Sequence, residues 1–306
     1  MDLTPANLQA LNTGFRANFN RGFVGVLPEY REIAMEVPSS TESNSYGWMG
    51  DMPEVREWLG ERVVHQLNAY GFTLVNKRFE LTIGVDVDKI EDDQYGVYGP
   101  IMTEFGRSVG RFPNKLVMSI LRGGTSGAAI GFDGKPLLAT DHPRLNAAGK
   151  PVGVSNWAGG AGSRWYLADL SRAIKPLVYQ PRKAFGFVRK DRPEDDNVFD
   201  NNEIRYGTNG RCNAGPGFWQ LIYGSGQELN VANFEAAKTA FEALKLERSD
   251  EKAGVMATHL IVPTDLEGAG RRILKAGLVP QTVGDNTVAV TNVWENAAQL
   301  LVLKSL

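Results

Sequence analysis

The chain has 306 residues, and its 34 glycines and 15 prolines indicate many turns and few long uninterrupted elements. Hydrophobic residues make up 42% and charged residues 22%, so the sequence can bury a core and is not that of a disordered protein. Lys plus Arg number 33 against 35 for Asp plus Glu, which excludes a protein that grips nucleic acid or an anionic membrane through bulk charge.

Residues 1–30 are predicted to form an N-terminal arm. Leu8, Leu11 and Phe15 form a weak helical stripe, and Thr4 with Pro5 suits an N-cap followed by a first turn. A short amphipathic helix has little to pack on by itself. We therefore expect the arm to lie on a neighbouring subunit or against the main body of its own chain.

Residues 31–88 carry the clearest strand signals. Apolar residues alternate with polar ones from Ile33 to Val37 and again from Phe79 to Val87. We expect these two runs to pair antiparallel at the base of a long excursion. The segment between them contains Trp48 and Trp58 but looks too short to build its own core, so it is a candidate projecting loop that is buried on another subunit.

Residues 89–165 begin with the strongest helix signal of the chain. Apolar residues spaced by three or four predict one face of a helix from Pro100 to Leu121, with a bend at Pro113. These residues are Ile101, Phe105, Val109, Phe112, Leu116 and Ile120. The glycine-rich part that follows, residues 122–164, is predicted to form loops and short hairpins.

A second stripe on the same helix is basic. Arg107, Arg111 and Lys115 recur every four residues. The stripe is either a solvated face or a set of charges that pairs with another subunit.

Residues 166–306 alternate strands with two helices. One helix is predicted from about Val231 to Leu246 with Asn230 as its cap, and the other from Thr264 to Gly277. Thr264 and Glu267 have the spacing of a capping box. With strands at 258–262, 287–291 and 300–303, this region predicts a compact α/β unit.

The residues that could carry chemistry are few and scattered. Asp141-His142 has the composition of an acid/base pair, but adjacent residues before Pro143 rarely face each other, so a locally bonded loop histidine is the favoured reading. Cys212 is the single cysteine and has no obvious histidine partner. No catalytic residue, cofactor or metal is predicted.

An acidic cluster lies between the second strand run and the long helix. Its members are Asp86, Asp88, Glu91, Asp92 and Asp93. The spacing does not fit an EF-hand loop, which favours helix-end anions or pairing between subunits over an ion site.

The arm, the excursion and the long helix each present an apolar surface poorly matched to their own length, which indicates an assembly subunit. In this order they resemble the major capsid subunit of tailed phages, and more narrowly the Mu-like phage major head subunit (gpT) family. The collinear matches that carry the resemblance are Tyr46-Gly47-Trp48, Glu57-Trp58-x-Gly60-x-Arg62, Asn76-Lys77-x-Phe79-Glu80, Gly106-Arg107-Ser108, Asp141-His142-Pro143, Trp165-Tyr166-Leu167, Gly217-Phe218-Trp219-Gln220 and Thr258-His259-x-x-Val262-Pro263.

The resemblance implies an α+β capsid fold of the Hong Kong phage type. The implied parts are an N-arm (1–30), an extended loop (31–88), a spine helix with the peripheral domain (89–165), and an axial domain with returning peripheral strands (166–306). It also implies a structural protein without catalysis, found in the virion and assembled in the bacterial host cytoplasm. Intersubunit contact candidates are Trp48, Trp58, Arg62, Lys77, Arg107, Arg111 and Lys115.

Several partners follow from the same resemblance. Copies of the chain are expected to form hexamers and pentamers around a separate scaffold protein, with a portal, and a decoration protein on the exterior is allowed. The shell would enclose double-stranded DNA without sequence-specific binding and without a membrane. Some capsid families crosslink a lysine to an asparagine, but no such bond is expected here for Lys77 and Asn76.

Two rival functions remain at this stage. One is the shell of a cellular nanocompartment with the same fold. The other, of a different class, is a cytoplasmic enzyme that uses the Asp141-His142 region. An assembling chain would form large particles, whereas the enzyme would remain a monomer or small oligomer.

Overall fold

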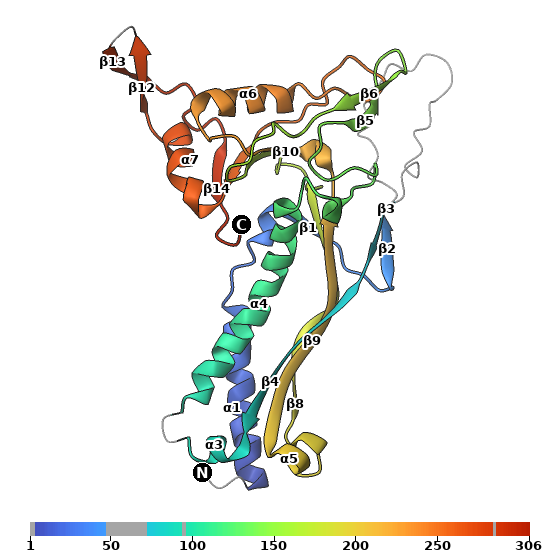
Figure 1. The fold of residues 1–306 in the computed structure, drawn as a ribbon, viewed down its shortest axis with the longest axis vertical. Coiled ribbons are helices and arrows are strands. Elements are labelled where there is room, and N and C mark those ends of the chain that lie inside the picture. The colour runs from blue at the N-terminus through green and yellow to red at the C-terminus, as the bar shows by residue number, and fades with distance from the viewer. Residues whose placement is uncertain (1–3, 47–71, 94–95, 284–285) are drawn as a thin grey trace.

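A computed structural model describes residues 4–46, 72–93, 96–283 and 286–306 (Figure 1). Helices and strands are mixed along the chain, which confirms the α+β class. The molecule has an elongated lower part, built on two long helices beside long strands, and a compact upper part that contains most of the second half of the chain (Figure 1). None of the helices in the described ranges is long and apolar enough to cross a membrane.

The arm forms helix α1 (Pro5–Val24) and begins as predicted. The Thr4 hydroxyl caps it by accepting a hydrogen bond from the Asn7 amide, and Pro5 occupies the first turn. The helix lies along helix α4 (Tyr98–Arg122) of the same chain, where Phe15 and Phe19 are buried in the lower core. Of the two expected locations, the structure shows the arm on its own main body.

Helix α4 confirms the predicted long helix and continues through Pro113. The predicted apolar face is correct for Phe105 and Val109, but Ile101 is 42% exposed. In the second half the fully buried residues are Val117, Met118 and Leu121, while the predicted Phe112, Leu116 and Ile120 are only partly buried. One apolar stripe does not describe the whole helix, because α1 covers its first half and the upper core covers its second half.

The main sheet of the lower part has the strand order β1-β8-β9-β4. Its strands are β1 (Ala34–Glu36), β8 (Leu177–Lys190), β9 (Glu203–Pro216) and β4 (Lys77–Asp86). The predicted strand at 79–87 is confirmed, whereas the run from Ile33 is shortened because Tyr30–Ile33 forms the short helix α2.

The predicted pairing of these two runs is wrong. The long β8-β9 hairpin lies between them, so β1 pairs in parallel with β8, and β4 pairs antiparallel with β9. The base of the excursion is instead a smaller antiparallel pair, β2 (Ser43–Tyr46) with β3 (Phe72–Val75). Residues 47–71 lie outside the described residues.

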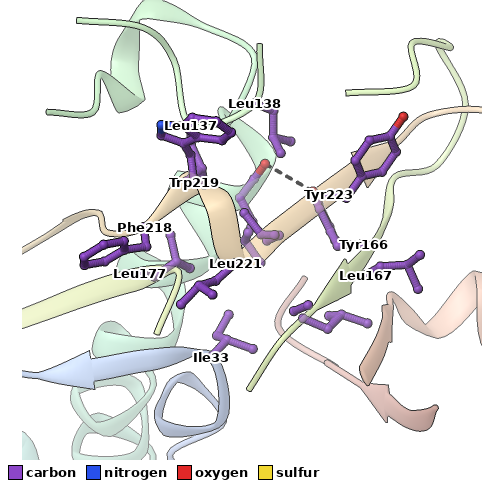
Figure 2. Packing of buried hydrophobic residues seen from close by; sticks show 14 of the residues in the cluster. Ile33, Leu137, Leu138, Tyr166, Leu167, Leu177, Phe218, Trp219, Leu221 and Tyr223 are labelled. Atoms are coloured by element: carbon purple, nitrogen blue, oxygen red, sulfur yellow. Dashed lines mark hydrogen bonds between the residues drawn. The ribbon is translucent and has the colours of Figure 1, made fainter. Parts of the chain in front are cut away.

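The upper part is built on a second sheet of order β10-β7-β11-β14. Its strands are β10 (Ile222–Ser225), β7 (Trp165–Ala168), β11 (His259–Val262) and β14 (Gln299–Val302). All four residues of β7 are fully buried. Figure 2 shows Tyr166 and Leu167 among side chains from segments far apart in the sequence, including Ile33, Leu137 and Leu221. This cluster is the larger of the two cores.

Helices α6 (Val231–Glu242) and α7 (Glu267–Leu274) contact strands of this sheet. The Asn230 cap of α6 is confirmed, although the helix ends four residues earlier than predicted. The capping box at Thr264 is wrong: residues 264–266 form a 3₁₀ turn after Pro263, and no side chain caps α7. Helix α7 ends at Leu274, before Gly277, and the Asn292 side-chain amide donates hydrogen bonds to the Ile273 and Ala276 carbonyls near this end.

The remaining elements are short. They are α3 (Val87–Glu91), a 3₁₀ turn (Gly127–Ala129), the hairpin β5 (His142–Leu145) with β6 (Pro151–Val154), α5 (Asp196–Asn201), a 3₁₀ turn (Trp219–Leu221), and the hairpin β12 (Leu278–Val283) with β13 (Asn286–Thr291). The predicted loops and hairpin between residues 122 and 164 are thus confirmed, as are the predicted strands at β11, β13 and β14.

Candidate assembly surfaces

The base of the excursion is held by a buried polar network. The Tyr46 hydroxyl donates to Gln180 Oε1 at 2.7 Å, and Gln180 Nε2 donates to the Leu74 carbonyl and to Asn76 Oδ1 at 3.0 and 2.9 Å. Asn76 Nδ2 continues the network to the Ser39 hydroxyl. Gln180 is fully buried, and burial raises the pKa of Tyr46.

This network fixes the two strands at the base of the excursion to the main sheet. It joins β2, β3 and the loop before β2 to strand β8, and each polar group has a partner, so the arrangement is specific as well as stabilising. Gln180 is a positioning residue that was not predicted from the sequence. Its signal was a polar residue directly after the apolar run Leu177–Tyr179 of a strand.

Lys77 and Asn76 point to different surroundings. Lys77 is exposed at the start of β4, whereas the Asn76 side chain is buried and fully engaged in the network. The Asn76 amide next to Lys77 is therefore engaged within its own chain. The other excursion candidates, Trp48, Trp58 and Arg62, lie outside the described residues.

The arm and the spine helix α4 approach each other at glycines. A β-carbon at Gly106 would clash with the Phe19 carbonyl, and one at Gly22 would clash with the Thr103 carbonyl. Backbones this close require glycine on either side of the crossing. The α1 surface that faces α4 is therefore occupied within the chain and is not available to a neighbour.

The basic stripe on α4 is divided by the structure. Arg107 pairs with Glu104 one turn away, at 2.6 Å. Arg111 and Lys115 are exposed and form no ion pair with any described residue. Two cations of the stripe are therefore free for contacts outside the chain, and one is satisfied on its own helix.

The acidic cluster serves helix ends. Asp86 caps α3 by accepting bonds from the amides of Asp88 and Lys89, and Asp93 accepts from the Val97 and Tyr98 amides at the start of α4. Among the residues that the structure describes, no group of acidic, histidine or cysteine side chains could hold a metal. The favoured expectation of helix-end anions is confirmed for these two residues.

The region of the rival enzyme has no open histidine. His142 is fully buried: its Nδ1 lies 2.6 Å from Asp133 Oδ2, its Nε2 lies 3.1 Å from Asn156 Oδ1, and its ring stacks on Trp219. Asp141 is exposed and binds Lys135, whose ammonium lowers the pKa of Asp141. As expected, the two neighbours do not face each other, and His142 fastens a loop to the upper core.

Cys212 is equally enclosed. It is fully buried in β9 beside Tyr179, and burial raises the pKa of its thiol. A buried thiol with a raised pKa is a poor nucleophile. His142 and Cys212 are therefore buried residues with structural surroundings.

Comparisons with known proteins agree with this geometry. A family model described as Mu-like prophage major head subunit gpT matches residues 8–306. The major capsid protein of Escherichia phage Mu is 36% identical over 313 residues, covering 99% of each chain. A chain from the procapsid of bacteriophage JBD30 is 37% identical, with a TM-score of 0.78 over 99% of this chain and 100% of that one.

A second solved structure extends the fold comparison. It is the JBD30 capsid decorated with minor capsid protein trimers, in which the matching chain is 26% identical with a TM-score of 0.74 over 100% of this chain and 99% of that one. Family, relatives and fold coincide over nearly the whole length. The chain therefore belongs to the Mu-like prophage major head subunit gpT family and is a structural protein, a major capsid protein of a tailed phage.

Proposed function

We propose that copies of this chain close into an icosahedral shell of hexamers and pentamers that encloses double-stranded DNA. The observation that supports this most is the full-length match to a procapsid subunit, in sequence and in fold. The proposed shell forms around a separate scaffold protein, includes a portal, and is assembled in the bacterial host cytoplasm. Its role is structural, and no catalytic residue is assigned.

We also propose a role for each segment of the chain. We assign residues 1–30 to the N-arm, 31–88 to the extended loop, 89–165 to the spine helix and peripheral domain, and 166–306 to the axial domain. Strands β8 and β9 return from the last segment into the lower part, where they lie between β1 and β4. This path supports their assignment as returning peripheral strands.

The predicted contact residues differ in the roles that we propose for them. Trp48, Trp58 and Arg62 of the excursion are proposed to contact the adjacent subunit, with Lys77 at its root. Arg111 and Lys115 have free charges for the same purpose, whereas Arg107 is already paired with Glu104. Many modest contacts engaged at once can stabilise a shell although each one is weak.

Near-neutral charge suits a container for DNA. With 33 basic and 35 acidic residues, the chain has little net attraction for phosphates, and tight phosphate binding would hinder packaging and release. Decoration of the exterior by a second protein is proposed on the example of the JBD30 capsid. A cellular nanocompartment shell is the alternative in which the same fold would enclose protein cargo instead of DNA.

Trp58→Ala tests the role of the excursion. The variant is expected to remain a soluble folded subunit that forms no shells, because an aromatic anchor of an interface is lost. Trp58→Phe is the matched control and should restore shells. Normal Trp58→Ala particles in negative-stain microscopy would contradict the proposed contact.

A further inference from the structure

A groove runs between the spine helix and the main sheet of the lower part. It encloses about 440 Å³ between α4 and strands β4, β8 and β9. Three aromatic rings form its floor, with Phe112 in contact with Phe79 at 4.6 Å and with Phe185 at 5.7 Å between centroids. All three remain only partly buried, so the groove presents apolar surface to solvent.

The groove also carries unsatisfied polar groups. Arg111 and Lys115 lie along its α4 side, four residues apart and without an ion-pair partner among the described residues. Thr208 Oγ1 lines it, buried and without a hydrogen-bond partner. The acidic groups of the groove are Glu104, which pairs with Arg107, and Glu80, which accepts a bond from Thr82. An apolar floor beside two free cations fits an apolar side chain accompanied by carboxylates.

The same chain displays such a group elsewhere. Phe199 is 82% exposed on α5, at the lower end of the molecule where β8 turns into β9 (Figure 1). Asp196 and Asp200 flank it, and neither forms an ion pair within the described part of the chain. The Asn197 side chain donates to the carbonyls of Lys190 and Glu203, so α5 is fastened to the hairpin and the exposure of Phe199 is a fixed feature.

The two charge pairs have matching spacing. Asp196 and Asp200 are four residues apart on α5, and Arg111 and Lys115 are four residues apart on α4, so each pair spans about 6 Å along its helix. Two parallel ion pairs beside one aromatic anchor would fix both position and register.

Phe199 cannot reach the groove of its own chain. Strand β9 begins at Glu203, just after α5, and Thr208 in the groove wall lies five residues farther along it, a distance of about 17 Å. We infer that Phe199 of one copy inserts into the groove of a neighbouring copy, with Asp196 and Asp200 against Arg111 and Lys115. This inference rests on the proposed shell. Because the plug and the groove are different surfaces, the contact is head-to-tail, as a closed ring of subunits requires.

Photocrosslinking tests the contact in assembled particles. Phe199→p-benzoyl-phenylalanine keeps an aromatic plug and makes it photoreactive. After irradiation of particles assembled from mixed isotope-labelled and unlabelled chains, mass spectrometry should find links between copies to peptides that contain Phe79, Phe112 or Phe185. The control is the same residue at Val293, which is 81% exposed outside the lower sheet and should not link to these peptides.

Charge reversal provides the second arm. Arg111→Glu with Lys115→Glu, or Asp196→Lys with Asp200→Lys, should each lower particle yield at least about tenfold, and the combined four-residue variant should recover most of it. Links from residue 199 only to other surfaces, or normal yield of both reversed variants, would overturn the contact while leaving the shell intact. A wild-type chain that forms no particles even with a scaffold would overturn the proposed function and the contact with it.

Discussion

The upper and lower parts of the molecule differ in how completely they bury their apolar side chains. In the upper part all four residues of β7 are fully buried, and the surrounding side chains come from segments far apart in the sequence (Figure 2). In the lower part, α1 and α4 cover one region of a long sheet, while Phe79, Phe112 and Phe185 remain partly open and Phe199 projects into solvent. The upper part has a continuous core within one chain, and we propose that the lower part contacts other copies.

The base of the excursion is held by the polar network around Gln180. The network holds the departing chain to β8 with buried hydrogen bonds rather than with an apolar core. Such bonds have directional geometry, so Tyr46 and Leu74 at the base of the excursion are held in fixed positions. A subunit that contacts its neighbours in a defined geometry needs rigid attachment points for the segments that make those contacts.

Two phenylalanines test the comparison most strongly. Phe234 is fully buried in the upper core and packs edge-to-face on Trp294, so Phe234→Ala should lower the free energy of unfolding by about 3–5 kcal/mol. Phe199→Ala is the control and should change it by less than about 0.5 kcal/mol, because that ring is exposed. Urea titrations measure both. Similar losses in the two variants would contradict the distinction between the parts.

The crossing of α1 and α4 is the next largest test. Gly106→Ala places a methyl group against the Phe19 carbonyl and should cost about 1–3 kcal/mol as the helices separate. Gly14→Ala on the exposed side of α1 meets nothing within 4 Å and should be neutral or stabilising by up to about 1 kcal/mol. Thermal unfolding followed by circular dichroism compares the pair. An unchanged Gly106→Ala variant would mean that α1 is not fixed on α4.

Two substitutions in the polar network should lower the free energy of unfolding by different amounts. Gln180→Leu removes three buried hydrogen bonds, those to the Tyr46 hydroxyl, the Leu74 carbonyl and Asn76 Oδ1, and should cost about 1–3 kcal/mol. Tyr46→Phe removes one hydroxyl from the same network and should cost about 1 kcal/mol. Equilibrium unfolding in urea gives both values. The reverse order of the two losses would show that Gln180 is not the centre of the network.

The smallest expected effect concerns pH and the upper part. Burial lowers the pKa of His259 from its usual 6.5, so below about pH 6.5 the unfolded chain binds a proton that the folded chain does not. The free energy of unfolding therefore falls on acidification until the lower, folded-state pKa is passed. His259→Gln should make the decrease between about pH 7 and about pH 5 smaller, by less than about 1 kcal/mol. An identical pH dependence in both proteins would contradict this contribution.

Local signals in the sequence predicted much of the fold. The long helix, the Asn230 cap, the β11 strand and the turn-rich centre all depend on residues close together in the chain. The partners of β1 and β4 could not be predicted, because both belong to the β8-β9 hairpin, which is contributed by distant residues 177–216. The capping box failed because the chain after Pro263 first forms a 3₁₀ turn.

The candidate surfaces were predictable to a smaller extent. The spacing of Arg107, Arg111 and Lys115 identified the stripe, but only the folded chain shows that Glu104 satisfies Arg107. The groove beneath the stripe combines α4 with three strands and has no local signature. Phe199 did have one, an aromatic residue among aspartates, which is typical of a surface segment rather than a core.

Electron microscopy of the expressed chain, alone and with a scaffold protein, tests the central claim most directly. Closed, uniform shells are expected, in which the lower part of each subunit contacts neighbouring copies. A persistently small globular species under all of these conditions, stabilised by a small ligand, would contradict the claim.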